Sequence, residues 1–108
     1  NNYVPAKHSL GALLIQQNKN PASITQAEKW LIQAARAGYA ESSLLMGRQL
    51  QQSDLTEEKA KAVIWYEVAQ QQGSAEAEKL AENLRPQVNP EAINLARQQI
   101  QRVLDGQN

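Results

Sequence analysis

The sequence predicts an all-α fold built from repeated pairs of helices. Two observations carry this prediction. Alanine and glutamine dominate the 108 residues, β-branched residues are few and phenylalanine is absent, a composition that favours helices. A pattern of tryptophan, alanine and glycine also recurs at a nearly constant spacing, as it does in repeat proteins. Because alanine-rich helices bury little apolar area each, such a chain depends on neighbouring units for its stability.

Two tryptophans mark the repeat, since Trp65 follows Trp30 by 35 positions. Small residues recur at the same offset: Ala27, Ala34, Gly38 and Ala40 correspond to Ala62, Ala69, Gly73 and Ala75. A second element, Leu10-Gly11, returns as Met46-Gly47 at an offset of 36. The offsets differ by one, which places a single-residue deletion in the loop around Ser53 and Asp54. Co-linear matches of this kind indicate a true internal repeat.

Each repeat is predicted to contain two helices, an A helix followed by a B helix. The A helices are expected at residues 4–17, 40–52 and 75–85, and the B helices at 24–37 and 57–72. Asn20-Pro21 and Ser53-Asp54 provide the turns between them, and Thr56 is suited to cap the second B helix. Gly38 and Gly73 fall where a residue of left-handed conformation ends each B helix.

The chain closes with one more predicted helix, at residues 90–104. Pro86 stops the third A helix, and Asn89-Pro90-Glu91 restarts the chain with a capping residue, a proline suited to the first turn and an acid near the positive end of the helix dipole. Its apolar residues share one face: Ile93, Ala96, Ile100 and Val103. A helix with one apolar and one polar face is typical of the terminal cap of a solenoid.

At these residues the chain resembles the Sel1-like repeat family, a relative of the tetratricopeptide repeat. Residues 61–66, KAVIWY, with Ala69 and Gly73, match the family pattern K-A-x-x-W-Y-x-x-A-x-x-x-G. Residues 38–47 follow its G-x-A-x-A-x-Y-x-L-G pattern, with Ser42, Leu44 and Met46 as substitutions. The first unit matches more loosely, and the family's G-x-G-V loop is missing from both A-to-B turns.

The resemblance implies one domain, a right-handed superhelix of antiparallel helix pairs. About two and a half repeats would occupy residues 2–85, and a capping helix and tail would occupy residues 86–108. In this family Trp65 and Tyr66 are packing residues at the seam between helices. Asn2 aligns with the glycine that follows a B helix, so we expect upstream repeats, with this chain as the C-terminal part of a longer array.

The chain offers little for catalysis. It has no cysteine, which excludes disulfides, thiol nucleophiles and zinc–cysteine sites, and its lone His8 argues against a metal site. Its acids, Glu57, Glu58, Glu76, Glu78 and Glu82, fall in first turns or on polar faces, where the helix dipole and solvation explain them. We therefore expect no enzyme and no cofactor.

Charge and hydropathy limit the classes of partner that the sequence predicts. Eleven basic and eleven acidic residues balance each other, so nothing indicates nucleic-acid binding. No apolar run approaches the ~20 residues that span a bilayer.

The A helices are predicted to line a concave groove with a polar stripe. At about 100° per residue, the open side of the second A helix carries Glu41, Leu45, Arg48 and Gln52. The repeat offsets add Glu76, Leu80 and Asn83 on the third A helix, and Ser9, Ala12 and Gln16 on the first. Leu45 and Leu80 would anchor an extended peptide while Arg48 bonds its carbonyls or a carboxylate. The alternative is that both leucines only touch neighbouring A helices.

The sequence thus predicts a non-enzymatic adaptor that binds a partner protein or peptide in this groove. The resemblance implies a bacterial role in envelope assembly or signalling, commonly in the periplasm, although the cytoplasm stays open. Two alternatives also stay open. One is a structural spacer that positions another domain, which a groove without an apolar patch would favour. The other is a peptidoglycan- or glycan-associated module, which an exposed Tyr3 or Tyr39 would favour.

Overall fold

The computed structural model describes residues 4–17 and 21–106 of the chain. Side chains at positions 4–6, 14, 16–17 and 21–24 lie outside this description. The described residues form helices and no strand, in the order α1 (Val4–Gln17), α2 (Pro21–Arg36), α3 (Ala40–Gln51), α4 (Thr56–Gln71), α5 (Ala75–Leu84), the 3-10 helix η1 (Arg85–Gln87) and α6 (Pro90–Leu104). The all-α prediction is confirmed. No helix of this described part is both long and apolar enough to cross a membrane.

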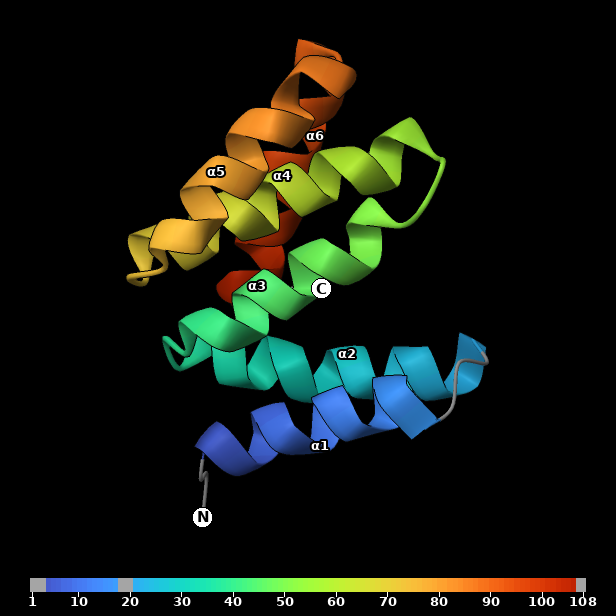
Figure 1. The fold of residues 1–108 in the computed structure, drawn as a ribbon, viewed down its shortest axis with the longest axis vertical. Helices are drawn as coiled ribbons and strands as arrows, with labels where there is room; N and C mark the ends of the chain where they lie inside the picture. The colour runs from blue at the N-terminus through green and yellow to red at the C-terminus, as the bar shows by residue number, and fades with distance from the viewer. Residues whose placement is uncertain (1–3, 18–20, 107–108) are drawn as a thin grey trace.

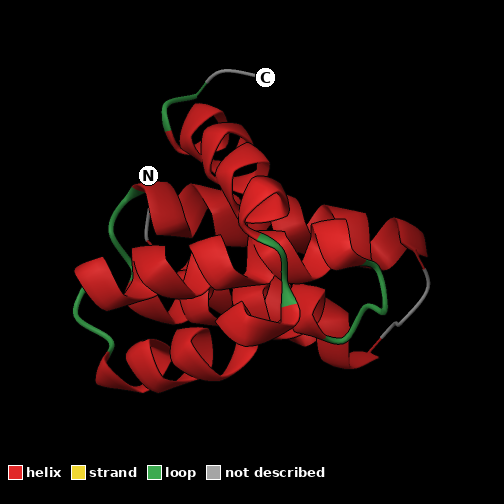
Figure 2. Ribbon diagram, turned by 90° about the horizontal axis from the view of Figure 1, so that it is seen from above, coloured by secondary structure: helices red, strands yellow, loops and turns green. Residues whose placement is uncertain are grey.

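Helices that follow one another in the chain pack against one another. α1 packs on α2, α2 on α3, α3 on α4 and α4 on α5. Figure 1 shows these helices stacked along the long axis of the molecule, whose extents are 38 × 28 × 27 Å. Figure 2 shows short loops at the ends of the helices. α6 departs from this order, because it packs mainly on α4 and also reaches α2.

Each repeat contains the same close approach between a glycine and a large side chain. A Cβ atom at Gly11 of α1 would lie 2.7 Å from Cγ of Leu31 of α2. A Cβ atom at Gly47 of α3 would lie 2.6 Å from Cδ1 of Tyr66 of α4. Both separations are shorter than van der Waals contact allows. The sequence repeat therefore marks equivalent contacts, in which the missing side chain lets two helices approach closely.

The ends of α2 and α4 also repeat each other. Gly38 and Gly73 have φ angles of +95° and +113°, so both lie in the left-handed region that glycine adopts without strain. The next amide in each turn bonds back to the helix: Tyr39 N donates to Ala34 O at 3.1 Å, and Ser74 N donates to Ala69 O at 2.9 Å. This is the Schellman arrangement, and it confirms the predicted glycine C-caps.

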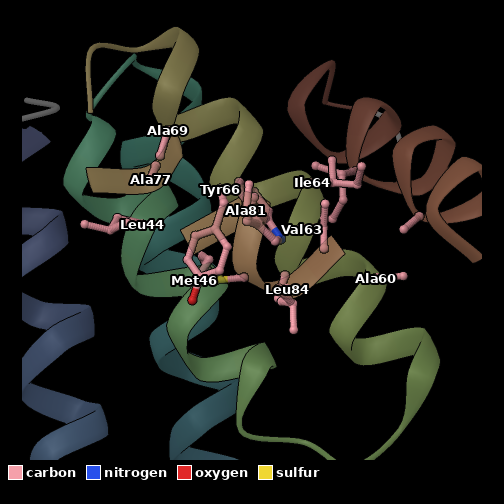
Figure 3. Packing of buried hydrophobic residues seen from close by; sticks show 14 of the residues in the cluster. Leu44, Met46, Ala60, Val63, Ile64, Tyr66, Ala69, Ala77, Ala81 and Leu84 are labelled. Carbon is pink, nitrogen blue, oxygen red and sulfur yellow. The ribbon is translucent and has the colours of Figure 1, made fainter. Parts of the chain in front are cut away.

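The core lies mainly around α4. Trp65 and Tyr66 are 1% and 0% exposed, and Figure 3 shows Tyr66 with Val63, Ile64 and other buried side chains of this cluster. The burial agrees with their predicted packing role. Trp30, the counterpart of Trp65, is only partly buried. The repeat therefore places the two tryptophans on equivalent helices without burying them equally.

The C-terminal region is attached to α4 by charge. Glu67 of α4 accepts hydrogen bonds from Arg85 of η1 at 2.7 Å and from Arg97 of α6 at 2.8 Å. The Nε atom of Arg36 in α2 donates to Val103 O at 2.9 Å. These contacts hold α6 across two other helices, in addition to its buried apolar face.

Of the predicted N-caps of α4 and α6, one is confirmed and the other is wrong. Oδ1 of Asn89 accepts from Ala92 N at 2.7 Å, so the predicted cap of α6 is confirmed. The predicted capping role of Thr56 is wrong: Leu55 occupies the N-cap position of α4 without a side-chain bond. The hydroxyl of Ser53 instead accepts from Leu55 N at 3.0 Å, which orders the turn one residue before the helix.

Candidate functional site

The strongest candidate site is a groove between α1, α3 and the turn that leads into α5, with a cavity volume of about 620 Å³. α1 contributes His8 and Ala12, and the turn contributes Gln72, Gly73 and Ser74. The remaining lining side chains come from α3 and the first turn of α5: Ala40, Glu41, Leu44, Leu45, Arg48 and Glu76. The groove thus combines apolar side chains of α1 and α3, the amide of Gln72 in the turn, and charged groups of α3 and α5.

The structure brings together five residues of the predicted stripe. They are Ala12, Glu41, Leu45, Arg48 and Glu76, which all line the groove. Ser9, Gln52, Leu80 and Asn83 lie outside this lining, and the side chain of Gln16 lies outside the described residues. Position along the helices explains the separation. The groove runs beside the first turn of α5, whereas Leu80 and Asn83 follow Glu76 by about one and two turns.

Arg48 and Glu76 form an ion pair that connects α3 with α5 across the groove. Their side chains are 46% and 59% exposed, so the pair is strongly solvated and contributes at most about 1 kcal/mol. The sequence placed both residues on the stripe but did not predict that they bind each other. A ligand carboxylate can therefore compete for Arg48 at small cost.

The two predicted leucine anchors have different surroundings. Leu45 and Leu80 are both partly buried and both pack against the core. Only Leu45 also lines the groove. For Leu80 the geometry favours the alternative interpretation, in which the side chain supports its helical neighbours. Leu45 serves both purposes, since one part of its side chain touches the core and another remains open to the groove.

His8 also contributes to the groove, although it was not among the residues predicted to line it. Its Nδ1 atom lies 2.9 Å from Oγ of the buried Ser42, and its ring meets that of Tyr39 edge to face at a centroid distance of 5.2 Å. These contacts connect α1 to the start of α3. The repeat offset of 36 relates His8 to Leu44, which also lines the groove, so the alignment held a signal for this position.

Gln72 joins the turn to two other elements. Its Nε2 atom donates to Ala35 O at 2.9 Å, and its Oε1 atom accepts from Ser43 Oγ at 2.8 Å. The amide is therefore held rigidly at the edge of the groove. Gln72 lies in a turn and not on an A helix, so the predicted stripe did not include it.

The charged side chains that line the groove are Glu41, Arg48 and Glu76. Glu41 is exposed and forms no ion pair with another described residue. With Arg48 paired to Glu76, the charged groups of the lining leave one net negative charge on Glu41. Within residues 4–17 and 21–106, no group of three histidine, cysteine or acidic side chains is placed to hold a metal ion.

Comparison of the chain with protein-family models, with curated proteins and with solved structures gives no match in any of the three.

Proposed function

We propose that the chain is a non-enzymatic adaptor that binds an extended peptide segment of a partner protein in the groove between α1, α3 and α5. One observation carries the proposal: the groove has a volume of about 620 Å³ and is lined by apolar and polar side chains from three A helices. Apolar contact gives a peptide its anchor, and polar groups bond its backbone and fix its register. We further propose that the helix pairs form a right-handed superhelix of the Sel1-like type.

Individual groups have distinct parts in this binding. Leu45 and Ala12 offer the apolar surface for one peptide side chain. Glu41 accepts hydrogen bonds from peptide amides or pairs with a basic side chain. Arg48 exchanges Glu76 for a peptide carboxylate or carbonyl, because the exposed ion pair is weak. The resemblance to the Sel1-like family supports a partner from bacterial envelope assembly or signalling and a periplasmic location.

Two features make the alternatives less favourable. A spacer needs no apolar patch in its groove, whereas Leu44, Leu45 and Ala12 provide one here. A glycan-binding module needs an open aromatic platform. Tyr39 is only partly exposed, and its ring is engaged by His8. Tyr3 lies outside the described residues.

The proposal is tested by selecting peptides from a displayed random library and measuring their affinity for groove variants. Ala12→Arg extends a long side chain from α1 into the groove, and it should weaken the selected peptides by at least about tenfold. Gln98→Arg adds the same side chain on the exposed surface of α6 and should leave affinity unchanged. Thermal melts establish that both variants fold. If Ala12→Arg folds and binds the peptides as tightly as the parent chain, the groove is not the binding site.

A further inference from the structure

A second cavity, of about 260 Å³, lies where α6 crosses from α4 towards α2; we call it the α6 cavity. Most of its wall is apolar and comes from four helices: Ile32, Met46, Leu50, Trp65, Ile100 and Val103. No described residue lines both this cavity and the peptide groove. The proposed adaptor function therefore leaves the α6 cavity without a role.

Charged groups line the same cavity from two facing helices. They are Glu28 of α2 and Glu58 and Lys61 of α4. Oε2 of Glu58 is buried and has no hydrogen-bond partner among the described residues. The nearest cation, Nζ of Lys61, lies 4.0 Å from it, which is beyond hydrogen-bonding distance. The Glu58 side chain as a whole is 34% exposed, so solvent and Lys61 offset part of the cost of this unbonded oxygen. A donor inside the cavity would remove the remainder.

The surroundings of Glu28 disfavour its charged form. Burial is the main cause that raises the pKa of Glu28, and the neighbouring Glu58 raises it further, while Lys61 opposes the shift. Two carboxylates and one ammonium group leave one net negative charge. A second cation placed between the carboxylates would complete the balance and supply the missing donor.

We propose that the α6 cavity binds a small organic cation with a short apolar chain, of the primary alkylammonium class. Its ammonium group donates to the carboxylates of Glu28 and Glu58, and its chain lies against the apolar wall beside Trp65. Ligand sites commonly have this composition, with an apolar wall and a few convergent polar groups. The cavity volume of about 260 Å³ leaves room for a ligand of about seven non-hydrogen atoms.

The test compares three probes that share one chain length: n-hexylammonium, hexan-1-ol and hexanoate. Each is titrated into the full chain while amide shifts are followed by NMR. Hexylammonium should saturate, with its largest shifts at residues of the α6 cavity such as Trp65 and Ile100. Hexanol should bind at least about tenfold more weakly because it lacks the charge, and hexanoate should not saturate. Absence of saturation by hexylammonium, or equal binding of the alcohol, overturns the proposal and leaves a water-filled gap only.

Variants then assign the recognition to the two acids. Glu28→Gln and Glu58→Gln should each weaken hexylammonium about tenfold while leaving hexanol unchanged. Glu57→Gln removes the same charge from the next position of α4, which is exposed and outside the α6 cavity, and it should have little effect. Melting curves verify folding, and each glutamine variant serves as a second route if the other unfolds. Unchanged hexylammonium affinity in a folded variant contradicts the assignment.

Discussion

Trp65 and Tyr66 stand side by side on α4 in a chain that has few aromatic residues. Both are buried, and they fill space that the neighbouring alanines leave open. The ring of Tyr66 lies against Gly47, and its hydroxyl donates to Oε1 of Gln51. Their burial could be predicted from the repeat, because both residues belong to the repeated pattern of residues 61–66. The partial exposure of Trp30 could not, since it depends on which helices cover α2.

Replacing each tryptophan by alanine should show the difference in burial between Trp65 and Trp30 as a difference in stability. Trp65→Ala removes a ring that is 1% exposed, and it should lower the free energy of unfolding by about 3–5 kcal/mol. Trp30→Ala should cost clearly less, because that side chain is only partly buried. Urea unfolding of both variants measures the difference. Equal losses would show that Trp65 has no special place in the core.

Tyr66 also predicts how stability changes at alkaline pH. Burial of the phenol raises its pKa from 10 to about 12, with Arg48 opposing the shift and Glu76 adding to it. The folded state therefore favours the neutral phenol. This contribution is complete below pH 10 and is lost as the pH rises from 10 towards about 12.

The control for this prediction is Tyr66→Phe, which keeps the ring and removes the titrating group. Its free energy of unfolding should be lower than that of the parent chain below pH 10, because the bond to Gln51 is lost. Above pH 10 the two curves should converge. Parallel curves throughout the alkaline range would contradict the assigned pKa shift.

Helix ends could be predicted from the sequence where the capping residue bonds only to its near neighbours in the chain. Gly38, Gly73 and Asn89 end or begin helices as predicted, since each acts through bonds to residues a few positions away. α4 departs from the rule because Leu55 occupies its N-cap without a side-chain bond. An apolar N-cap carries no sequence signal, so Thr56, the first polar residue of the helix, was misassigned.

The attachment of α6 depends on contacts that no local pattern reveals. Glu67 alone joins α4 to both Arg85 and Arg97. Its side chain is 21% exposed and those of the arginines are about half exposed, so solvent screens both pairs. Glu67→Gln should therefore lower the free energy of unfolding by only about 1 kcal/mol, and added salt should reduce the difference.

Hydrogen exchange of the α6 amides measures how far the loss of the Glu67 ion pairs loosens this helix. Amides of α6 should exchange faster in Glu67→Gln than in the parent chain, while those of α1 should not change. Glu82→Gln is the matched control, since Glu82 is exposed on α5 and forms no ion pair with another described residue. Unchanged exchange in α6 would mean that the ion pairs of Glu67 do not contribute to holding it in place.

The arrangement of the whole molecule decides which predicted residues meet. Projection of single helices placed Glu41, Leu45, Arg48 and Glu76 on one stripe, and all four line the groove. A projection of single helices cannot give the angle between α3 and α5. It also cannot show where the turn before α5 closes the groove. The contribution of Gln72 and the position of Leu80 outside the lining depend on that geometry. The α6 cavity likewise follows from the crossing of α6 over α4 and α2.

The most direct test of the proposed adaptor function is an NMR map of a library-selected peptide bound to the chain. Amide shifts should concentrate around the groove, at Ala12, Leu45, Gly73 and Ser74. The Arg48 guanidinium signal should also move as its bond to Glu76 is exchanged. Residues on the exposed face of α6 should remain unchanged. Shifts concentrated on α6, with the groove unaffected, would show that the peptide does not bind in the groove.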